Sequence, residues 1–495
     1  MTRARHLDDS NRKILSMAAQ EPVRRPYLEG NYAPISTETE VRGLTSRGAI
    51  PRDLAGVFVR NSPNPRFAPK ARHHWFDGDG MLHAVHFEDG AATYRNRWIR
   101  TKAFLAEQEA GCALWNGITE RPDFTNPRGP LKDTSNTDLV FHAGRLMTLW
   151  WLGGEAYVVS VPDLETRGTE DWGGKVKTIT AHPKVDPVTK EMVFYDHKPF
   201  PPYLTLGVIS AAGELVHHTE VELPGPRLQH DMAITENYSI LFDMSMMWDE
   251  KLLAEGRTKV GFFRDKPTRF GIIPRFGKGD TIRWFEASPC YMYHTVNAWE
   301  QGDEIVLLGC KIVNPLAGDV NNPKNVQAPS IGFLRLEPHY HRWTFNLKTG
   351  AVKEEELDDT LAEFPRMDNR ALGRHSRFSY HPRIAPAETM FFDGVIKYDT
   401  DSGKSWTHRY PAGRFGGETV FAPREGSKSE DDGYLVTFVA DEQTGESELY
   451  ILDAAHVDEE PVARVHIPTR VPTGYHSWWI PADELAHQRP MDSLS

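Results

Sequence analysis

The chain has 495 residues, of which 39% are hydrophobic and 25% are charged, a balance typical of a water-soluble globular protein. A formal net charge of −12 at pH 7 argues against nucleic acid or an anionic membrane as the main partner, because both bind to basic surfaces. No segment approaches the roughly 18 consecutive apolar residues that cross a bilayer, so we expect no stable membrane insertion.

The first part of the chain differs in composition from the rest. Residues 1–45 are polar with scattered prolines and are predicted to form an N-terminal arm packed on the body. Residues 46–495 are predicted to form one catalytic domain. The three cysteines show no CxxC spacing and no dense disulfide pattern, which favours a reduced, cytoplasmic compartment.

Short strand-like segments rich in β-branched and aromatic residues dominate the body. They read, in chain order, DLVFHAGRLMTLW, EAYVVSV, EMVFYDH, YSILFDM, DEIVLLG, HRWTFNL, ETMFFDG, YLVTFVA and ELYILDA. Turns with Asp or Asn followed by Gly, such as NLKTGAV and YDTDSGK, separate them. Short helices are predicted only at Ser10–Gln20, Lys102–Glu109, Glu250–Glu255 and around Thr360.

So many short strands favour an all-β fold in which four-stranded blades repeat around an axis. The length of the body predicts about six to eight blades. A pair of stacked β-sandwiches is the alternative, although no linker-like segment marks a boundary between two such domains.

Four of the 21 histidines stand in uncharged, turn-flanked or aromatic surroundings next to strand-like runs. They are His182 in TAHPKVDP, His230 in RLQHDMAIT, His294 in YMYHTVNAW and His476 in TGYHSWWIP. The inner strands of a propeller converge on its axis, so one residue from each of four blades can meet there. Such a meeting would create a metal site from residues that are far apart in the sequence.

Imidazole ligands suit Fe, Zn, Cu and Ni. Four histidines around octahedral iron would leave two positions open, whereas four around tetrahedral zinc would close the site and make it structural. Metal-bound histidine also needs its second ring nitrogen held, commonly by a carboxylate. Glu363 in LAEFPRMDNR and Glu418 in FGGETVFAP stand in low-charge surroundings and are the candidates for this role, with a solvated strand end as the alternative.

At these residues the chain resembles the carotenoid cleavage oxygenase family. The resemblance runs over nearly the whole chain and includes GVFVRNSPNPRF, HHWFDGDGMLHAVHF, SNTDLVFHAGRL, EFPRMDNR, EDDGYLVTFVAD and GYHSWW. It implies a seven-bladed β-propeller in which short helices and loops cap one face over a central metal. It further implies Fe(2+) held by the four histidines, a hydrophobic tunnel to the metal, and Glu363 and Glu418 as two of three outer glutamates.

The third outer glutamate of that pattern is missing. The segment where it would fall reads TLWWLGGEAY, with Trp150, Trp151 and Leu152 in its place and Glu155 a few residues later. We therefore expect one of the four histidines to be oriented by water, a backbone carbonyl or an indole ring instead.

Within the family, TKAFLAEQEAGCALWNG resembles the enzymes that act on lignostilbenes, stilbenes and isoeugenol. Stilbene cleavers typically carry a tyrosine at the place of Asn116–Ile118 and a lysine at the place of Trp150. Their absence here argues against phenolate-assisted cleavage of a hydroxystilbene. The expected substrate pocket includes Phe67, Ile118, Trp150 and Trp151.

The resemblance thus predicts a non-heme Fe(II) dioxygenase that uses O2 to cleave the C=C bond of an aromatic alkene, such as isoeugenol, 4-vinylguaiacol or a stilbenoid, to two carbonyl products. Cleavage of an apocarotenoid or carotenoid polyene is the alternative. No catalytic residue beyond the metal ligands is expected. A propeller hydrolase with a central Ca2+ would need carboxylate ligands, and a non-enzymatic scaffold would bind no iron.

Overall fold

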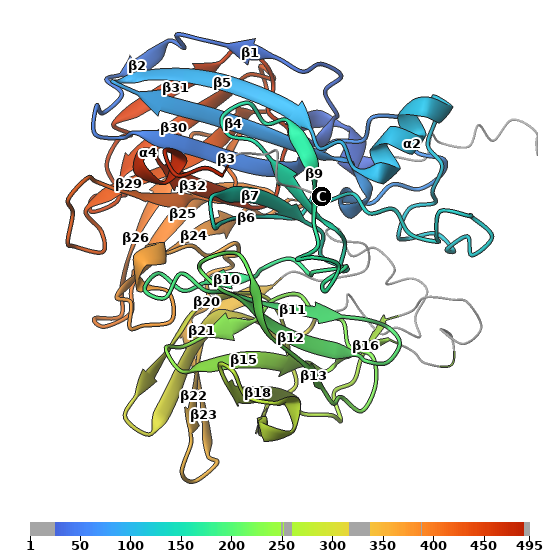
Figure 1. Cartoon of the computed structure of the whole chain (residues 1–495). Helices are drawn as coiled ribbons and strands as arrows, with labels where there is room; N and C mark the ends of the chain where they lie inside the picture. Colours follow the sequence, from blue (N-terminus) through green and yellow to red (C-terminus); the bar gives the residue numbers. More distant parts are fainter. Residues whose placement is uncertain (1–24, 249–250, 252–259, 316–336, 388, 490–495) are drawn as a thin grey trace, which may run out of the picture.

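The computed structural model describes residues 25–248, 251, 260–315, 337–387 and 389–489. In this part of the chain, seven antiparallel sheets form the blades of an all-β propeller, and β16 (Met246–Trp248) and β17 (Val260–Phe262) form a separate ribbon (Figure 1). The predicted fold class is therefore confirmed, and the stacked-sandwich alternative is wrong.

The first four blades come mostly from the N-terminal part of the chain. In spatial order, the first contains β1 (Glu40–Val41), β5 (Ala91–Trp98), β4 (Gly80–Glu88), β3 (Gly56–Pro63) and β32 (Ser477–Pro481). The second contains β6 (Asp138–His142), β7 (Arg145–Leu149), β8 (Ala156–Val159) and β9 (Thr166–Glu170). The third contains β10 (Lys184–Val185), β11 (Met192–His197), β12 (Leu204–Ile209) and β13 (Leu215–Val221). The fourth contains β14 (Ala233–Ile234), β15 (Tyr238–Asp243), β18 (Thr268–Pro274) and β19 (Arg283–Ala287).

The other three blades complete the ring. The fifth contains β20 (Tyr291–Gln301), β21 (Glu304–Ile312), β22 (Pro338–Asn346) and β23 (Val352–Asp358). The sixth contains β24 (Phe378–Ile384), β25 (Phe392–Asp399) and β26 (Lys404–Arg409). The seventh contains β2 (Ser46–Gly48), β31 (Ala463–Ile467), β30 (Ser447–Asp453) and β29 (Gly433–Asp441), with β27 (Arg414–Phe415) and β28 (Val420–Pro423) both paired to β29.

Strands in the middle of a blade are covered on both faces, because neighbouring blades pack against them. Every residue of β3, β11 and β12 is buried, including polar residues such as Arg60 and Asn61 of β3. By contrast, β13 at the outer edge of its blade alternates between exposed and half-buried residues along most of its length.

Both ends of the chain close the ring. Near the C-terminus, β32 pairs with β3 of the first blade, from Gly56 opposite Pro481 to Arg60 opposite Ser477. Near the N-terminus, β2 pairs with β31 of the last blade, with Ser46 opposite Val465. Figure 1 accordingly shows the blue and red strands side by side. The ring is thus closed at two places, where a strand from one end of the chain joins a blade formed mainly by the other end.

The described part of the predicted N-terminal arm consists of the 3-10 helices η1 (Pro26–Leu28) and η2 (Gly30–Tyr32), followed by β1. The side chains of Tyr27 and Tyr32 are buried in the core that surrounds the centre of the propeller. The separation of residues 1–45 as an arm stays a prediction, since residues 1–24 lie outside the described residues.

The helices are short. Helix α2 (Lys102–Ala110) matches the prediction for Lys102–Glu109 to within one residue; the Thr101 side chain caps its start and Gly111 ends it at φ +70°. The others described are α4 (Ala482–Leu485), η3 (Trp75–Asp77), η4 (Gly279–Thr281) and η6 (Asn369–Ala371).

The helix predicted around Thr360 is wrong. Asp358 Oδ1 accepts the Thr360 backbone N–H at 2.6 Å, and this turn competes with helix formation. The predicted helix Ser10–Gln20 lies outside the described residues, as does all of Glu250–Glu255 except Lys251.

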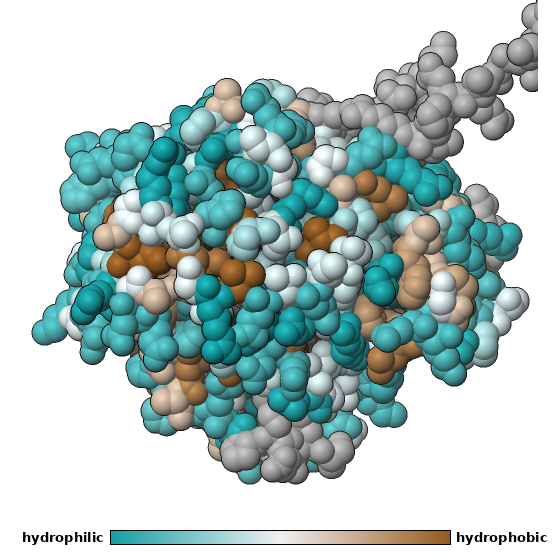
Figure 2. All heavy atoms as spheres, turned by 90° about the horizontal axis from the view of Figure 1, so that it is seen from above, coloured by the Kyte–Doolittle hydropathy of each residue, from teal (hydrophilic) through white to brown (hydrophobic). Residues whose placement is uncertain are grey.

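In the described residues, none of the helices has the length and apolar content needed to cross a membrane. The face of the molecule seen from above is mostly hydrophilic, and its hydrophobic side chains appear in separate groups (Figure 2). Scattered apolar groups of this kind are usual on protein surfaces.

Candidate metal centre

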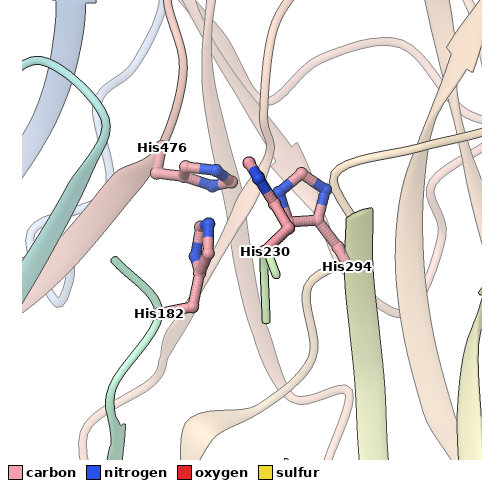
Figure 3. Close-up of side chains that lie close together, drawn as sticks. All are labelled: His182, His230, His294 and His476. Carbon is pink, nitrogen blue, oxygen red and sulfur yellow. The ribbon is translucent and has the colours of Figure 1, made fainter. Parts of the chain in front are cut away.

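The four histidines singled out in the sequence meet at the centre of the propeller. His182 lies two residues before β10, His230 three before β14, His294 within β20, and His476 directly before β32. All four are buried, and their candidate ligand nitrogens lie within 4.8 Å of one another. Figure 3 shows the four imidazole rings turned toward a common point.

Burial keeps most of these rings uncharged. It lowers the pKa of His182, His230 and His476 well below the ordinary value, and the neighbouring histidines add to the effect. Burial also disfavours the charged form of His294, but the adjacent Glu363 carboxylate outweighs it and raises the pKa of this ring. Neutral imidazole has a free lone pair, which is the form that binds a metal ion.

Two of the rings are held by the glutamates predicted from the sequence. Glu363 Oε2 lies 2.5 Å from His294 Nδ1, and Glu418 Oε1 lies 2.9 Å from His476 Nδ1. Both carboxylates are buried, and burial raises the pKa of Glu418 to about 7 although Arg366 opposes it. A carboxylate at Nδ1 leaves Nε2 as the ligand atom.

A third carboxylate, which sequence reasoning missed, holds His182. Asp138 Oδ2 lies 3.1 Å from His182 Nδ1. The Nε2 atoms of His182 and His294 are buried and make no hydrogen bond within the described part of the chain. Buried imidazole nitrogens rarely remain unpaired, and their convergence fits a metal ion coordinated at this point.

His230 has no carboxylate partner among the residues that the structure describes. Its Nδ1 is buried and unbonded there, and its ring centroid lies 4.8 Å from that of Tyr293 and 6.4 Å from that of Trp151. Glu155 cannot supply the missing group, since it pairs with Lys102 and accepts a bond from Tyr157 Oη at 3.1 Å. The rings of Tyr293 and Trp151 pack beside this imidazole, and the group that holds its Nδ1 stays a prediction.

A partly enclosed cavity, called the chamber below, borders the histidines on one side. Aromatic rings form its walls in mutual contact: the Phe76 ring centroid lies 5.1 Å from Trp151 and 5.5 Å from Tyr475. The full lining comprises Trp75, Phe76, Thr137, Trp151, His230, Tyr293, His294, Glu363, Phe364, Met390, Tyr475 and His476. Of the four residues predicted for the substrate pocket, Trp151 lies here.

The other three predicted pocket residues, Phe67, Ile118 and Trp150, line a neighbouring, more open cavity. Phe76 lines both cavities and forms part of the wall between them. Trp150 and Trp151 are adjacent in sequence but face different cavities, because β7 ends at Leu149 and the chain then turns. Contact of any of these side chains with a substrate stays a proposal.

Comparison with known proteins agrees with this geometry. The family model described as retinal pigment epithelial membrane protein, RPE65, matches residues 32–481. The carotenoid 9,10(9′,10′)-cleavage dioxygenase of Crocus sativus is 37% identical over 94% of this chain and 90% of its own. The lignostilbene dioxygenase of Pseudomonas brassicacearum superposes with a TM-score of 0.83 at 27% identity, covering 92% of this chain and 98% of its own.

Cobalt-substituted apocarotenoid oxygenase of Synechocystis superposes with a TM-score of 0.79 at 25% identity, covering 91% of this chain and 97% of its own. The family match spans nearly the whole chain, and the Crocus relative exceeds 30% identity over most of both proteins. The chain therefore belongs to the RPE65/carotenoid cleavage oxygenase family, a family of enzymes that cleave C=C double bonds oxidatively.

Proposed function

We propose that His182, His230, His294 and His476 bind Fe(2+), and that the chain uses O2 to cleave the C=C bond of an aromatic alkene to two carbonyl products. The observation that carries this proposal is the cluster of four buried imidazoles, three of which line a largely aromatic chamber. Bound iron would supply the activation of O2, and an uncharged ligand set would leave its positive charge intact.

The chain's own contribution is to position the alkene and exclude water. The chamber walls are mainly aromatic rings, which suit a flat conjugated substrate. Its ionisable groups are unsuited to proton transfer: Glu363 is committed to His294, and burial raises the pKa of Tyr293 and Tyr475 well above the ordinary value. This agrees with a reaction that needs no acid or base from the protein.

Residues of the chamber wall carry hydrogen-bond donors, although the surface that the chamber presents is almost entirely apolar. Four buried donors there have no partner among the described residues: Trp75 Nε1, Trp151 Nε1, Tyr293 Oη and Tyr475 Oη. Leaving such a group unpaired costs about 1–3 kcal/mol. We propose that one of these groups turns into the chamber and donates to a methoxyl or hydroxyl oxygen on an aryl ring, as in isoeugenol, whereas a pure hydrocarbon polyene offers no such acceptor.

Cleavage of an apocarotenoid is the second candidate, favoured by the name and the 37% identity of the Crocus relative. Purified, iron-loaded enzyme should be assayed separately with isoeugenol, a hydroxylated stilbene and an apocarotenal, and the aldehydes separated by chromatography. We expect vanillin and acetaldehyde from isoeugenol. Products from the apocarotenal alone would reject the aromatic substrate and retain the polyene.

Removing single hydroxyls from the chamber tests the oxygen-bearing substrate. Tyr475→Phe and Tyr293→Phe keep the rings but delete one donor each, so kcat/KM for isoeugenol should fall about 2- to 13-fold per variant, the equivalent of one neutral hydrogen bond. With β-methylstyrene, which lacks the ring oxygens, the same variants should match the wild type.

Tyr380→Phe is the matched control, because Tyr380 also has a buried, unbonded hydroxyl among the described residues but packs against Phe421, away from the chamber. Tyr380→Phe should leave kcat/KM unchanged for both isoeugenol and β-methylstyrene. Equal losses on both substrates in the chamber variants would contradict a role in binding substrate oxygen.

A further inference from the structure

Asp138 makes contacts with His182 that go beyond ordinary packing. It is the first residue of β6 in the second blade, and its side chain is 8% exposed. Oδ2 lies 3.1 Å from the ring Nδ1 of His182 and accepts the backbone N–H of the same residue at 3.0 Å. Oδ1 accepts the Leu139 backbone N–H at 2.7 Å. The carboxylate thus holds both the ring and the backbone of His182.

The backbone of His182 needs such support. Its φ is +70°, in the left-handed region that costs a residue with a side chain roughly 1–2 kcal/mol. A residue keeps this conformation only when its surroundings fix it. A bond from the His182 N–H to Asp138 fixes the turn, and the contact at Nδ1 fixes the direction of the ring.

The two predicted glutamates show related arrangements, in which a carboxylate contacts a ring nitrogen and also accepts a backbone N–H. Glu418 contacts His476 Nδ1 through one oxygen and accepts the Ser477 backbone N–H through the other. Glu363 contacts His294 Nδ1 and accepts the N–H of Phe364, whose φ is also positive at +53°. In each case one carboxylate couples a ring to the local backbone.

We propose that Asp138 is a positioning residue that supplies to His182 what Glu363 and Glu418 supply to His294 and His476. The chain thereby keeps three carboxylates at its centre although the segment around Trp151 contributes none. His230 is the histidine left without one in the described part of the chain. This inference rests on the proposed metal site.

Asp138 and His182 also face a different space from the other three histidines. Both line a cavity that does not include His230, His294 or His476 and that contains Lys184 and Arg366. Both cations pair with other carboxylates: Lys184 lies 2.7 Å from Asp231, and Arg366 Nε lies 3.1 Å from Glu418. The carboxylate of Asp138 is therefore left to His182.

The test is the affinity of the full-length protein for Co2+, measured by competition with a chelator. In Asp138→Asn, the amide has one acceptor oxygen where the carboxylate has two, so it cannot keep both backbone N–H bonds, from His182 and Leu139, together with the contact to His182 Nδ1. Loss of such an outer group weakens metal binding about 10- to 100-fold. We expect this loss together with shifted absorption bands of the Co2+-loaded protein, and a Glu363→Gln variant should show a loss of similar size.

Asp196→Asn is the matched control, because Asp196 is a buried carboxylate of the third blade that bonds Thr178 at 2.7 Å and touches none of the four histidines. It should retain wild-type affinity and spectrum. If Asp138→Asn does not fold, Asp138→Glu decides the question: it keeps the charge but displaces the oxygens, so the absorption bands should still shift.

Wild-type affinity and an unchanged Co2+ spectrum in a folded Asp138 variant would overturn the inference while leaving the metal site intact. Failure of the wild-type protein to bind Co2+ or Fe(2+) at all would instead reject the proposed function on which the inference rests. The two failures are therefore distinguishable in one experiment.

Discussion

Replacing His230 with alanine is expected to abolish both iron retention and alkene cleavage. The substitution removes one of the four proposed ligands, and even loss of an outer partner costs about 10- to 100-fold in affinity, so the loss of a ligand should exceed about 100-fold. Iron in the purified variant should be measured by atomic emission, and turnover by vanillin release from isoeugenol.

His230 is the most informative of the four positions. Its ring has no carboxylate partner in the described residues, whereas alanine at His294 would leave the buried carboxylate of Glu363 without its imidazole. Such an orphaned group is itself destabilising, so the effect of His230→Ala on metal binding is the easiest to interpret.

His341→Ala is the control for loss of a buried imidazole. His341 lies on β22 with its ring 4.5 Å from Trp343, and neither of its ring nitrogens has a hydrogen bond in the described residues. This variant should keep iron and activity. Full iron occupancy with normal turnover in His230→Ala would reject the proposed ligand set.

Local sequence context singled out the four histidines and two of the three carboxylates as candidates, and the family resemblance assigned their roles. Glu363 and Glu418 stand among apolar and glycine residues, which indicates burial. Asp138 could not be found in this way, because it reads as the polar first residue of an ordinary strand and lies 44 residues before its partner His182. The contact joins two blades, and no local pattern encodes it.

The propeller itself was predictable because its strands follow one another closely in the chain. The strand pairing that closes the ring was less predictable, since β32 pairs with β3 from the opposite end of the sequence. The cavities faced by Trp150 and Trp151 depend on the turn after Leu149, which the sequence does not specify.

Truncation after Thr473 is expected to cost the protein its fold as well as its metal. The deletion removes His476 and all of β32, which exposes the edge of β3 in the first blade. It also removes the buried side chains of Trp479 and Ile480. Burying one large apolar side chain stabilises the fold by about 1.5–3 kcal/mol, so these two contribute about 3–6 kcal/mol. A typical domain is stable by only about 5–15 kcal/mol in total.

Calorimetry should therefore show no cooperative unfolding transition in the truncated chain, and emission spectroscopy should find no iron. The full-length His476→Ala variant separates the two effects: β32 still closes the ring on β3, so this variant should lose iron but unfold cooperatively. A truncated chain that keeps its iron would show that neither His476 nor closure by β32 is required. If instead both predictions hold, the pairing of β32 with β3 both closes the propeller and places His476 at the metal centre.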